Sequence, residues 1–187
     1  MRITGGRARG IPLQTGRAKG VRPATDKMRE RVFSSLGDLV PGASVLDLFA
    51  GTGAYGLEAL SRGAREVLFV EQQADAIAAI RLNTAAVLRS LGHPADQTAS
   101  FARRDALRFT SEQRFDLIFA DPPYPLLREQ LGPILTLAAG LLSVSPPGRL
   151  ILEKPGDLVL PTSPLTSLRE LGKSGPNDPS AAILALP

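Results

Sequence analysis

The chain has 187 residues, of which 43% are hydrophobic and 21% charged, and its formal net charge is +4. This length suits about one domain with a complete hydrophobic core. The absence of cysteine and the single histidine exclude a disulfide scaffold and Cys- or multi-His metal sites, so we expect no metal. No apolar run approaches the roughly 18 residues of a membrane helix, and we expect a cytoplasmic protein that does not bind a membrane.

The positive charge is concentrated at the amino end of the chain. Residues 1–36 hold nine of the 22 Lys and Arg residues but only two of the 18 acidic residues. Such a segment suits a polyanion such as RNA, because each cation placed near a phosphate releases condensed counterions. On charge alone, a solvated basic tail is an equally good interpretation.

The same amino-terminal residues suggest three short elements. Residues 2–6 and 10–14 flank a GGRARG turn and could pair as a small hairpin. Residues 15–23 read as a loop, and a helix capped by Thr25 or Asp26 should run to Leu36. Its apolar face would hold Met28, Val32, Phe33 and Leu36. We therefore divide the chain into a basic extension, residues 1–36, and a catalytic domain, residues 37–187.

From residue 44 the pattern alternates between strands and helices. Such alternation predicts an α/β fold, a doubly wound, Rossmann-like sheet with helices on both faces. Two further runs flank a turn without an intervening helix, which predicts an antiparallel hairpin at the end of the sheet. The strands are expected at 44–50, 66–71, 98–103, 115–121, 149–153, 167–171 and 181–186. Helices are expected at 74–91 and 126–142, and a glycine-rich turn with a short helix at 51–62.

The loop after the first of these strands is rich in glycine. Gly51, Gly53 and Gly56 fit the G-x-G-x-x-G pattern, and Glu71 follows Gly51 by 20 residues at the end of the next strand. Glycines let the backbone approach a nucleoside cofactor, and a strand-end carboxylate accepts hydrogen bonds from ribose hydroxyls. The pattern alone fits both NAD and S-adenosylmethionine, and a tight turn without a ligand is the remaining alternative.

Asp47 interrupts an otherwise apolar strand, four residues before the first glycine. A carboxylate is costly to bury unless it is paired. A cofactor with a cationic amino group would pair with it, directly or through water, whereas a pyrophosphate would be repelled. The structural alternative is an aspartate that caps a helix or binds water.

The strand at 115–121 ends in Asp121-Pro122-Pro123-Tyr124. Two prolines stop the strand and make the turn rigid. The Asp121 side chain and the Pro122 carbonyl could both accept hydrogen bonds from an exocyclic NH2 group, while Tyr124 stacks on its ring. The alternative is a strand terminator followed by a chance aromatic residue.

These residues together resemble a known family. The segments DLFAGTGAYGLEALSRGA and DPPY are similar to class I S-adenosylmethionine-dependent amino-methyltransferases. The segments RITGGRARGIPL and RPATDKMRERVFSSL resemble the bacterial small-subunit (16S) ribosomal RNA guanine-N2-methyltransferases. The resemblance covers about residues 1–155. The last hairpin departs from it, because LGKSGPNDPSAAILAL lacks the expected aromatic residue.

The resemblance implies a seven-stranded mixed sheet, S-adenosylmethionine as cofactor and an extension that helps to hold RNA. It implies that Asp47, Gly51, Gly53 and Glu71 bind the cofactor, with Asp105 and Ala106 beside its adenine. Asp121, Pro122 and Tyr124 would be catalytic, and Pro123 and Tyr124 would also contact the guanine. Arg2, Arg7, Arg9, Arg22 and Thr25 are the expected RNA-binding residues.

The sequence therefore predicts a methyltransferase that acts on the N2 amine of a guanine in 16S ribosomal RNA. The substrate is free RNA or an assembled small-subunit particle, and we expect a monomer. A nicotinamide-dependent oxidoreductase is the rival class, and it leaves Asp47 and the DPPY motif unexplained. DNA or protein amino-methyltransferases share that motif, and a non-catalytic RNA-binding protein is the last alternative.

Overall fold

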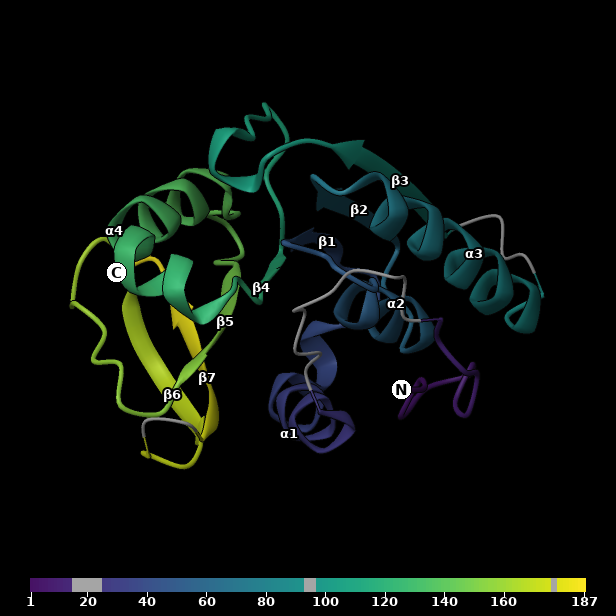
Figure 1. Ribbon diagram of the computed structural model, residues 1–187, viewed down its shortest axis with the longest axis horizontal. Helices are drawn as coiled ribbons and strands as arrows, with labels where there is room; N and C mark the ends of the chain where they lie inside the picture. Colours follow the sequence, from purple (N-terminus) through teal and green to yellow (C-terminus); the bar gives the residue numbers. More distant parts are fainter. Residues whose placement is uncertain (15–24, 93–96, 176–177) are drawn as a thin grey trace.

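A computed structural model describes residues 1–14, 25–92, 97–175 and 178–187. The chain forms one mixed sheet of seven strands in the order β3-β2-β1-β4-β5-β7-β6 (Figure 1). The first five strands are parallel, whereas β7 is antiparallel to both β5 and β6. This confirms the predicted α/β class and the hairpin at the end of the sheet. The strands are β1 (Ser44–Leu48), β2 (Glu66–Glu71), β3 (Thr98–Arg103), β4 (Leu117–Ala120), β5 (Arg149–Pro155), β6 (Thr166–Gly172) and β7 (Pro179–Ala185).

Helices cover both faces of the sheet, as in a doubly wound fold. Residues of α1 (Asp26–Leu36), α2 (Ala54–Ser61) and α3 (Ala74–Ser90) pack in one hydrophobic core. Residues of α4 (Tyr124–Leu141) and of the 3-10 helix η2 (Ala106–Arg108) pack in a second core on the opposite face. A further 3-10 helix, η1 (Gly37–Leu39), follows α1.

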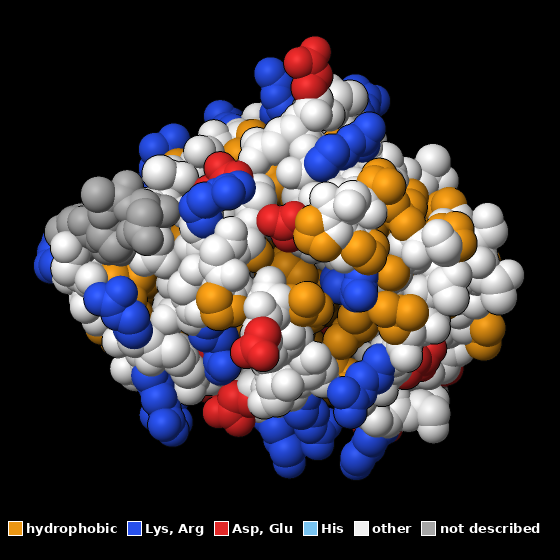
Figure 2. Space-filling view, turned by 180° about the vertical axis from the view of Figure 1, so that it is seen from behind, with side chains coloured by type: hydrophobic (Ala, Val, Ile, Leu, Met, Phe, Trp, Pro, Cys, Tyr) orange, Lys and Arg blue, Asp and Glu red, His pale blue; other side chains and the backbone are white. Residues whose placement is uncertain are grey.

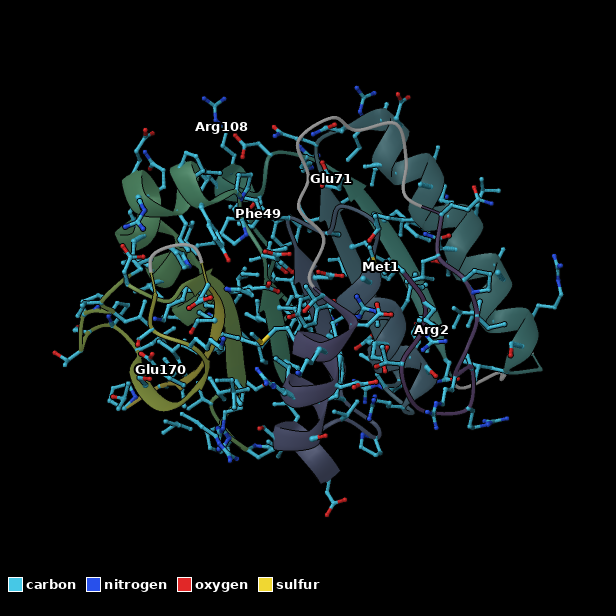
Figure 3. All side chains as sticks on the ribbon, turned by 60° about the horizontal axis from the view of Figure 1, so that its bottom comes forward. Met1, Arg2, Phe49, Glu71, Arg108 and Glu170 are labelled. Carbon is cyan, nitrogen blue, oxygen red and sulfur yellow. The ribbon has the colours of Figure 1, made fainter. Side chains whose placement is uncertain are left out.

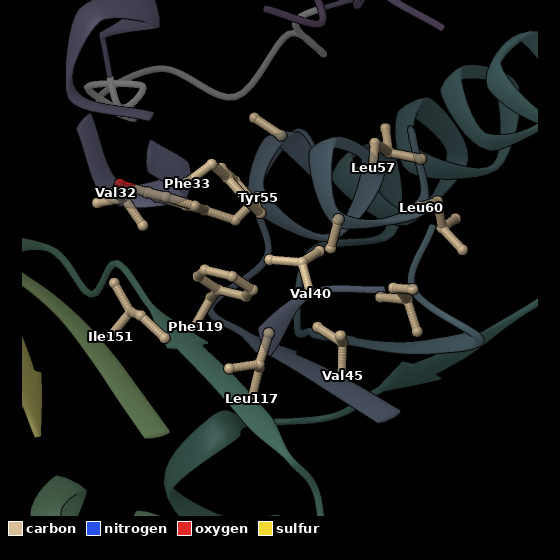
Figure 4. Close-up of a cluster of buried hydrophobic side chains, with 14 of the residues drawn as sticks. Val32, Phe33, Val40, Val45, Tyr55, Leu57, Leu60, Leu117, Phe119 and Ile151 are labelled. Atoms are coloured by element: carbon tan, nitrogen blue, oxygen red, sulfur yellow. The ribbon is translucent and has the colours of Figure 1, made fainter. Parts of the chain in front are cut away.

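Strand alternation decides which face each functional side chain enters. Phe119 of β4 and Ile151 of β5 belong to the core under α1–α3, whereas Ala120 and Leu152 belong to the core under α4. Successive side chains along a strand point to opposite faces. Asp121 and Glu153, which follow Ala120 and Leu152, therefore point to the α1–α3 face. Figure 4 shows this core, where Phe33 and Tyr55 lie over Phe119.

Helix α1 matches its prediction closely. It begins after Thr25, whose side chain accepts a hydrogen bond from the Met28 N–H at 3.2 Å, and it ends before Gly37, which has a φ of 50°. All four residues of the predicted apolar face are buried. Helix α4 begins at Tyr124, two residues before the expected start, because a proline in the first helical turn loses no helical hydrogen bond.

Residues 2–6 and 10–14, which were expected to pair as a small hairpin, pair less regularly than two strands do. The Ile3 N–H donates to the Ile11 carbonyl at 2.9 Å, and a single antiparallel bridge joins Arg2 to Pro12. Ile3 and Leu13 are nevertheless buried in the core under α1–α3. The predicted loop at 15–23 and Arg22 lie outside the described residues.

Buried polar contacts attach this extension to α2. The carboxylate of Glu58, which is fully buried, accepts hydrogen bonds from the Thr4 N–H and hydroxyl, both at 2.8 Å. It also pairs with Arg62 at 2.9 Å, and the buried Arg29 lies 4.0 Å away. Arg29 is therefore part of the interior, and its charge does not belong to the solvent-exposed basic surface.

The face of the molecule shown in Figure 2 carries both charged and hydrophobic side chains. In the view of Figure 2, Lys and Arg side chains lie mainly around the rim, and hydrophobic side chains gather toward the side of α4 and the carboxyl-terminal strands. No helix in the described ranges is long and apolar enough to cross a membrane. Among these same residues, no three His, Cys, Asp or Glu side chains group so that they could hold a metal ion.

Candidate active site

A cavity of about 300 Å³ opens at the carboxyl ends of the central parallel strands. This is where open α/β sheets bind their ligands. Its walls come from the loops after β1, β2, β3 and β4, from β5, from the start of β7 and from the residue before α1. The lining residues are Thr25, Phe49, Gly51, Val70, Glu71, Gln72, Gln73, Arg104, Asp105, Ala106, Asp121, Pro122, Pro123, Tyr124, Pro125, Leu126, Glu153 and Pro179.

Glu71 forms one wall of the cavity at the end of β2. Its carboxylate accepts hydrogen bonds from the Gly51 N–H at 3.0 Å and from the Gln73 N–H at 2.8 Å. These two bonds fix the side chain against the glycine loop, and Figure 3 shows Glu71 and Phe49 at the same end of the sheet. A carboxylate held in this way remains able to accept further hydrogen bonds from vicinal hydroxyls, because each oxygen carries two lone pairs.

The glycine loop has the backbone geometry that its sequence requires. Gly53 is left-handed, with a φ of 76°, and it precedes α2. At Gly56, an added Cβ would lie 2.4 Å from Phe69 Cε1 and 2.7 Å from Val67 Cγ1, so a side chain there would separate α2 from β2. Phe49 has a φ of 57° and lines the cavity, and it is the only non-glycine residue with positive φ in the described ranges. Such local strain is concentrated at functional sites.

Asp47 lies beneath this loop and not on the cavity wall. Its Oδ2 accepts a hydrogen bond from the Gly56 N–H at 2.9 Å, which is the capping arrangement that the sequence left open. Burial raises the pKa of Asp47 from 3.8 to about 8, the Gly56 hydrogen bond opposes this shift, and the charge of Glu71 adds to it. The predicted cofactor contacts of Asp47 and Gly53 stay predictions, because neither residue lines the cavity.

Asp121, Pro122, Pro123 and Tyr124 form the opposite wall. Burial raises the pKa of the Asp121 carboxyl well above its usual range, and the charges of Glu153 and Asp47 raise it further. Pro122 is buried, and Pro123 occupies the position that caps α4. The sequence prediction that the glycine loop and this motif share one crevice is confirmed by the lining of the cavity, to which Gly51 and all four residues contribute.

Glu153 is a cavity residue that the sequence analysis missed. It lies on β5, is 5% exposed, and its Oε2 accepts a hydrogen bond from the Tyr55 hydroxyl at 2.8 Å. The Tyr55 ring stacks on Phe119 of β4 with a centroid distance of 5.1 Å. The signal was the one used for Asp47, an acidic residue within a buried apolar strand, and it could have identified Glu153 as well.

Asp105 and Ala106 line the cavity on the β3 side, and their predicted place beside the adenine stays a prediction. Asp105 caps η2 by accepting a hydrogen bond from the Leu107 N–H at 3.0 Å. Ala106 is buried and, together with Phe49 and Val70, makes this part of the wall apolar.

The predicted RNA-binding residues do not lie together. Thr25 lines the cavity, whereas Arg2, Arg7 and Arg9 are exposed and do not. Arg7 donates a hydrogen bond to the Leu91 carbonyl at 3.1 Å, and its backbone N–H donates to the Ser61 carbonyl at 2.7 Å. Both acceptors lie at the carboxyl ends of α3 and α2, so Arg7 stands at the end of the sheet opposite to the cavity.

The cavity fits the cofactor that the sequence predicts. S-adenosylmethionine carries two ribose hydroxyls, a flat apolar adenine ring and a cationic amino-acid end. The backbone-anchored carboxylate of Glu71 suits the hydroxyls, and the apolar wall with its neighbouring Asp105 suits an adenine and its amine. A pyrophosphate would instead meet the acidic side chain of Glu71, which would repel it.

Comparison with known proteins gives three close similarities. The family model described as "Conserved hypothetical protein 95" matches residues 1–171. "Putative rRNA methyltransferase YlbH" of Bacillus subtilis is 34% identical over 166 residues, which is 86% of each chain. "Ribosomal RNA small subunit methyltransferase D" of Escherichia coli is 34% identical over 126 residues, which is 66% of this chain and 60% of that relative's length.

Solved structures share the fold over most or all of the chain. "Putative methyltransferase yhhF from Escherichia coli" superposes with a TM-score of 0.76 and 27% identity, and the match covers 100% of this chain and 97% of that chain. The structure of SMU.776 complexed with SAH covers 86% of this chain and 49% of its own, with a TM-score of 0.64 and 16% identity. This last likeness concerns the fold alone.

Proposed function

Because the chain belongs to the family described as conserved hypothetical protein 95, we propose that it methylates the exocyclic N2 amine of a guanine in small-subunit ribosomal RNA. Its relatives named as ribosomal RNA methyltransferases support the substrate class. S-adenosylmethionine is the cofactor. A cytoplasmic location and a monomeric state remain expectations.

One observation carries this proposal: Glu71 and the Asp121–Tyr124 segment face the same cavity. The Glu71 side suits a nucleoside cofactor, and the Asp121 side suits a planar ring with an exocyclic amine. Two such half-sites in one cavity bring two reactants together, and correct placement alone accelerates a two-substrate reaction by a large factor.

The chain's own residues act mainly by orientation. S-adenosylmethionine supplies an electrophilic methyl group when it is bound. Asp121 and the Pro122 carbonyl accept the two hydrogens of the target amine and turn its lone pair into the cavity, while Tyr124 stacks on the base. The target guanine must leave the stack of RNA bases to reach this position, and other enzymes that modify bases also act on an unstacked base.

The environment of Asp121 also provides a place for the released proton. When the amine nitrogen bonds to the transferred methyl group, it becomes cationic and must then lose a proton. The pKa of Asp121 is raised by burial and by the nearby Glu153 and Asp47, so its carboxylate accepts a proton more readily than an ordinary aspartate. Asp121 therefore combines amine binding with proton acceptance.

The alternative enzyme classes differ in whether they give a role to the Asp121–Tyr124 wall of the cavity. A nicotinamide oxidoreductase gives no role to the Asp121–Tyr124 wall. An adenine or protein amino-methyltransferase would use that wall. Only the identity of the methylated substrate distinguishes these enzymes from the proposed one. The basic extension and the named relatives favour ribosomal RNA over DNA or protein.

The test is to incubate the protein with labelled S-adenosylmethionine and small-subunit ribosomal RNA, either free or assembled with ribosomal proteins. The RNA is then digested, and the labelled nucleoside is identified by mass spectrometry. We expect N2-methylguanosine at one position, and an Asp121→Ala variant serves as the matched control. Label in N6-methyladenosine, or transfer to protein, would contradict the proposal.

A further inference from the structure

We propose that Glu153 determines base specificity, because its carboxylate accepts the N1–H of the target guanine while Asp121 and Pro122 hold the neighbouring 2-amine. This inference rests on the proposed function and identifies what makes the cavity selective for guanine. The Asp-Pro-Pro-Tyr motif cannot do so, because it recognises an exocyclic amine that adenine also carries.

The first support is the position of Glu153 beside Asp121. The parallel strands β4 and β5 are paired in the register Phe119↔Ile151 and Ala120↔Leu152. Asp121 and Glu153 are the residues that directly follow Ala120 and Leu152, and both line the cavity. Adjacent strands lie about 4.8 Å apart, so the structure presents two carboxylates side by side at one wall.

The second support is the pattern of hydrogen-bond donors on the base. Guanine has two adjacent donors on its pairing edge, N1–H and the 2-amine. Adenine has an amine next to N1, which is a lone-pair acceptor. Two neighbouring carboxylates match the guanine pattern, whereas adenine would place its N1 lone pair against the second carboxylate.

The third support concerns the orientation of Glu153. The Tyr55 hydroxyl donates to Oε2 at 2.8 Å, which fixes the carboxyl group at the wall of the cavity. Tyr55 is itself fixed, since it is 5% exposed and its ring stacks on Phe119. The side chain of Glu153 is thus held in place by a rigid partner.

The experiment uses a base analogue that separates the two donors. 2-Aminopurine keeps the 2-amine but has a lone pair at N1 in place of N1–H. Small-subunit RNA is prepared with guanine or 2-aminopurine at the methylated position, and single-turnover methylation rates are measured. The proteins compared are the wild type, Glu153→Gln, and Tyr55→Phe as the control that removes the Oε2 hydrogen bond but keeps the carboxylate.

We expect the wild type to prefer guanine. In Glu153→Gln the ratio of guanine to 2-aminopurine rates should fall by about ten- to a hundredfold, because the amide can donate to N1 of the analogue and the charged acceptor is lost. Tyr55→Phe keeps the carboxylate but removes the hydrogen bond that orients it, so the ratio should fall by less than in Glu153→Gln. A purely structural role of Glu153 would lower both rates together and leave the ratio unchanged.

Two outcomes overturn the inference while the proposed function stands. One is a wild type that methylates guanine and 2-aminopurine equally, a result that needs no folded variant. The other is a Glu153→Gln protein, folded by circular dichroism, whose ratio equals that of the wild type. A wild type that methylates neither RNA refutes the proposed function itself.

Discussion

At the scale of single residues, Glu71 is the anchor of the cofactor half of the cavity. Replacement by Ala removes a charged hydrogen-bond acceptor that two backbone N–H groups hold in place. The affinity for S-adenosylhomocysteine should fall about ten- to a hundredfold. Calorimetric titration measures this, and an affinity equal to that of the wild type would remove Glu71 from the binding site.

Asp121 should affect the rate of methyl transfer far more than cofactor binding. Replacement by Ala is expected to lower single-turnover rates by about a hundredfold, because the target amine loses its orientation. Replacement by Asn should retain more activity, since the amide oxygen still accepts a hydrogen bond. The pKa of Asp121 is raised, so the wild-type rate should increase as the pH rises and the carboxyl ionises, and this increase should be absent in Asp121→Asn. An Asp121→Ala rate close to that of the wild type would refute the role.

Asp47 should make stability depend on pH. Its pKa is raised from 3.8 to about 8 in the folded protein, so the folded state holds a proton that the unfolded state has already released between these values. The contribution of Asp47 to stability therefore falls as the pH rises from about 4 to about 8. Asp47→Asn keeps an acceptor for the Gly56 N–H and cannot ionise, so its stability relative to the wild type should increase over this window by a few kcal/mol.

Urea unfolding at pH 5 and at pH 8.5 measures this difference. The exposed Asp38 on η1 offers a control, and Asp38→Asn should not change stability differently at the two pH values. A constant difference between Asp47→Asn and the wild type across the range would show that the buried carboxyl does not carry the shift.

At the scale of elements, the close packing of α2 on β2 depends on Gly56. Gly56→Ala would place its Cβ 2.4 Å from Phe69 Cε1, so we expect a loss of about 1–3 kcal/mol of unfolding free energy. Gly140, on α4, is the matched control, because nothing lies within 4 Å of its added Cβ. Gly140→Ala should be neutral or stabilise by up to about 1 kcal/mol. Equal unfolding midpoints for the two variants would contradict the packing argument.

The elements were predicted well from sequence because their signals are local. The bounds of β2 and β3 agree with the predicted ranges, since an apolar run between turns defines a strand without reference to the rest of the chain. The cavity wall was predicted in part for the same reason, because glycines and prolines mark the ends of strands. Glu153 carries the same local signal as Asp47 and was overlooked, whereas its position beside Asp121 could not be predicted, because it depends on strand order, which is a long-range property.

At the scale of the whole molecule, the basic residues of the amino-terminal turn lie far from the reaction. Helix α3 starts near the cavity, after β2, and its 17 residues span about 25 Å. The Arg7 side chain donates a hydrogen bond to the Leu91 carbonyl at the far end of this helix. This position was not predictable, because Arg7 is separated from Leu91 by 84 residues. Any RNA that contacts both the turn and the cavity must therefore extend along this side of the protein.

This distance makes the effect of Arg9→Ala dependent on RNA size. With long small-subunit RNA, the variant should bind more weakly, and the slope of log K against log salt should fall by about 0.7. With an oligonucleotide of a few bases around the guanine, the variant should equal the wild type, and cofactor affinity should not change. Arg114→Ala, exposed and outside the extension, is the control. Parallel salt plots of equal affinity with the long RNA would leave the extension as a passive tail.

The assembly of the cavity from distant parts of the chain has a consequence for the order of events during synthesis on the ribosome. Glu153 meets Tyr55 across 98 residues, and Pro179, which lines the cavity, belongs to β7, the last strand to be made. A growing chain can pair β1, β2 and β3 and dock its basic extension on α2 long before β7 emerges. The amino-terminal part of the sheet would thus form first, and the cavity would be complete only once β7 has paired with β5.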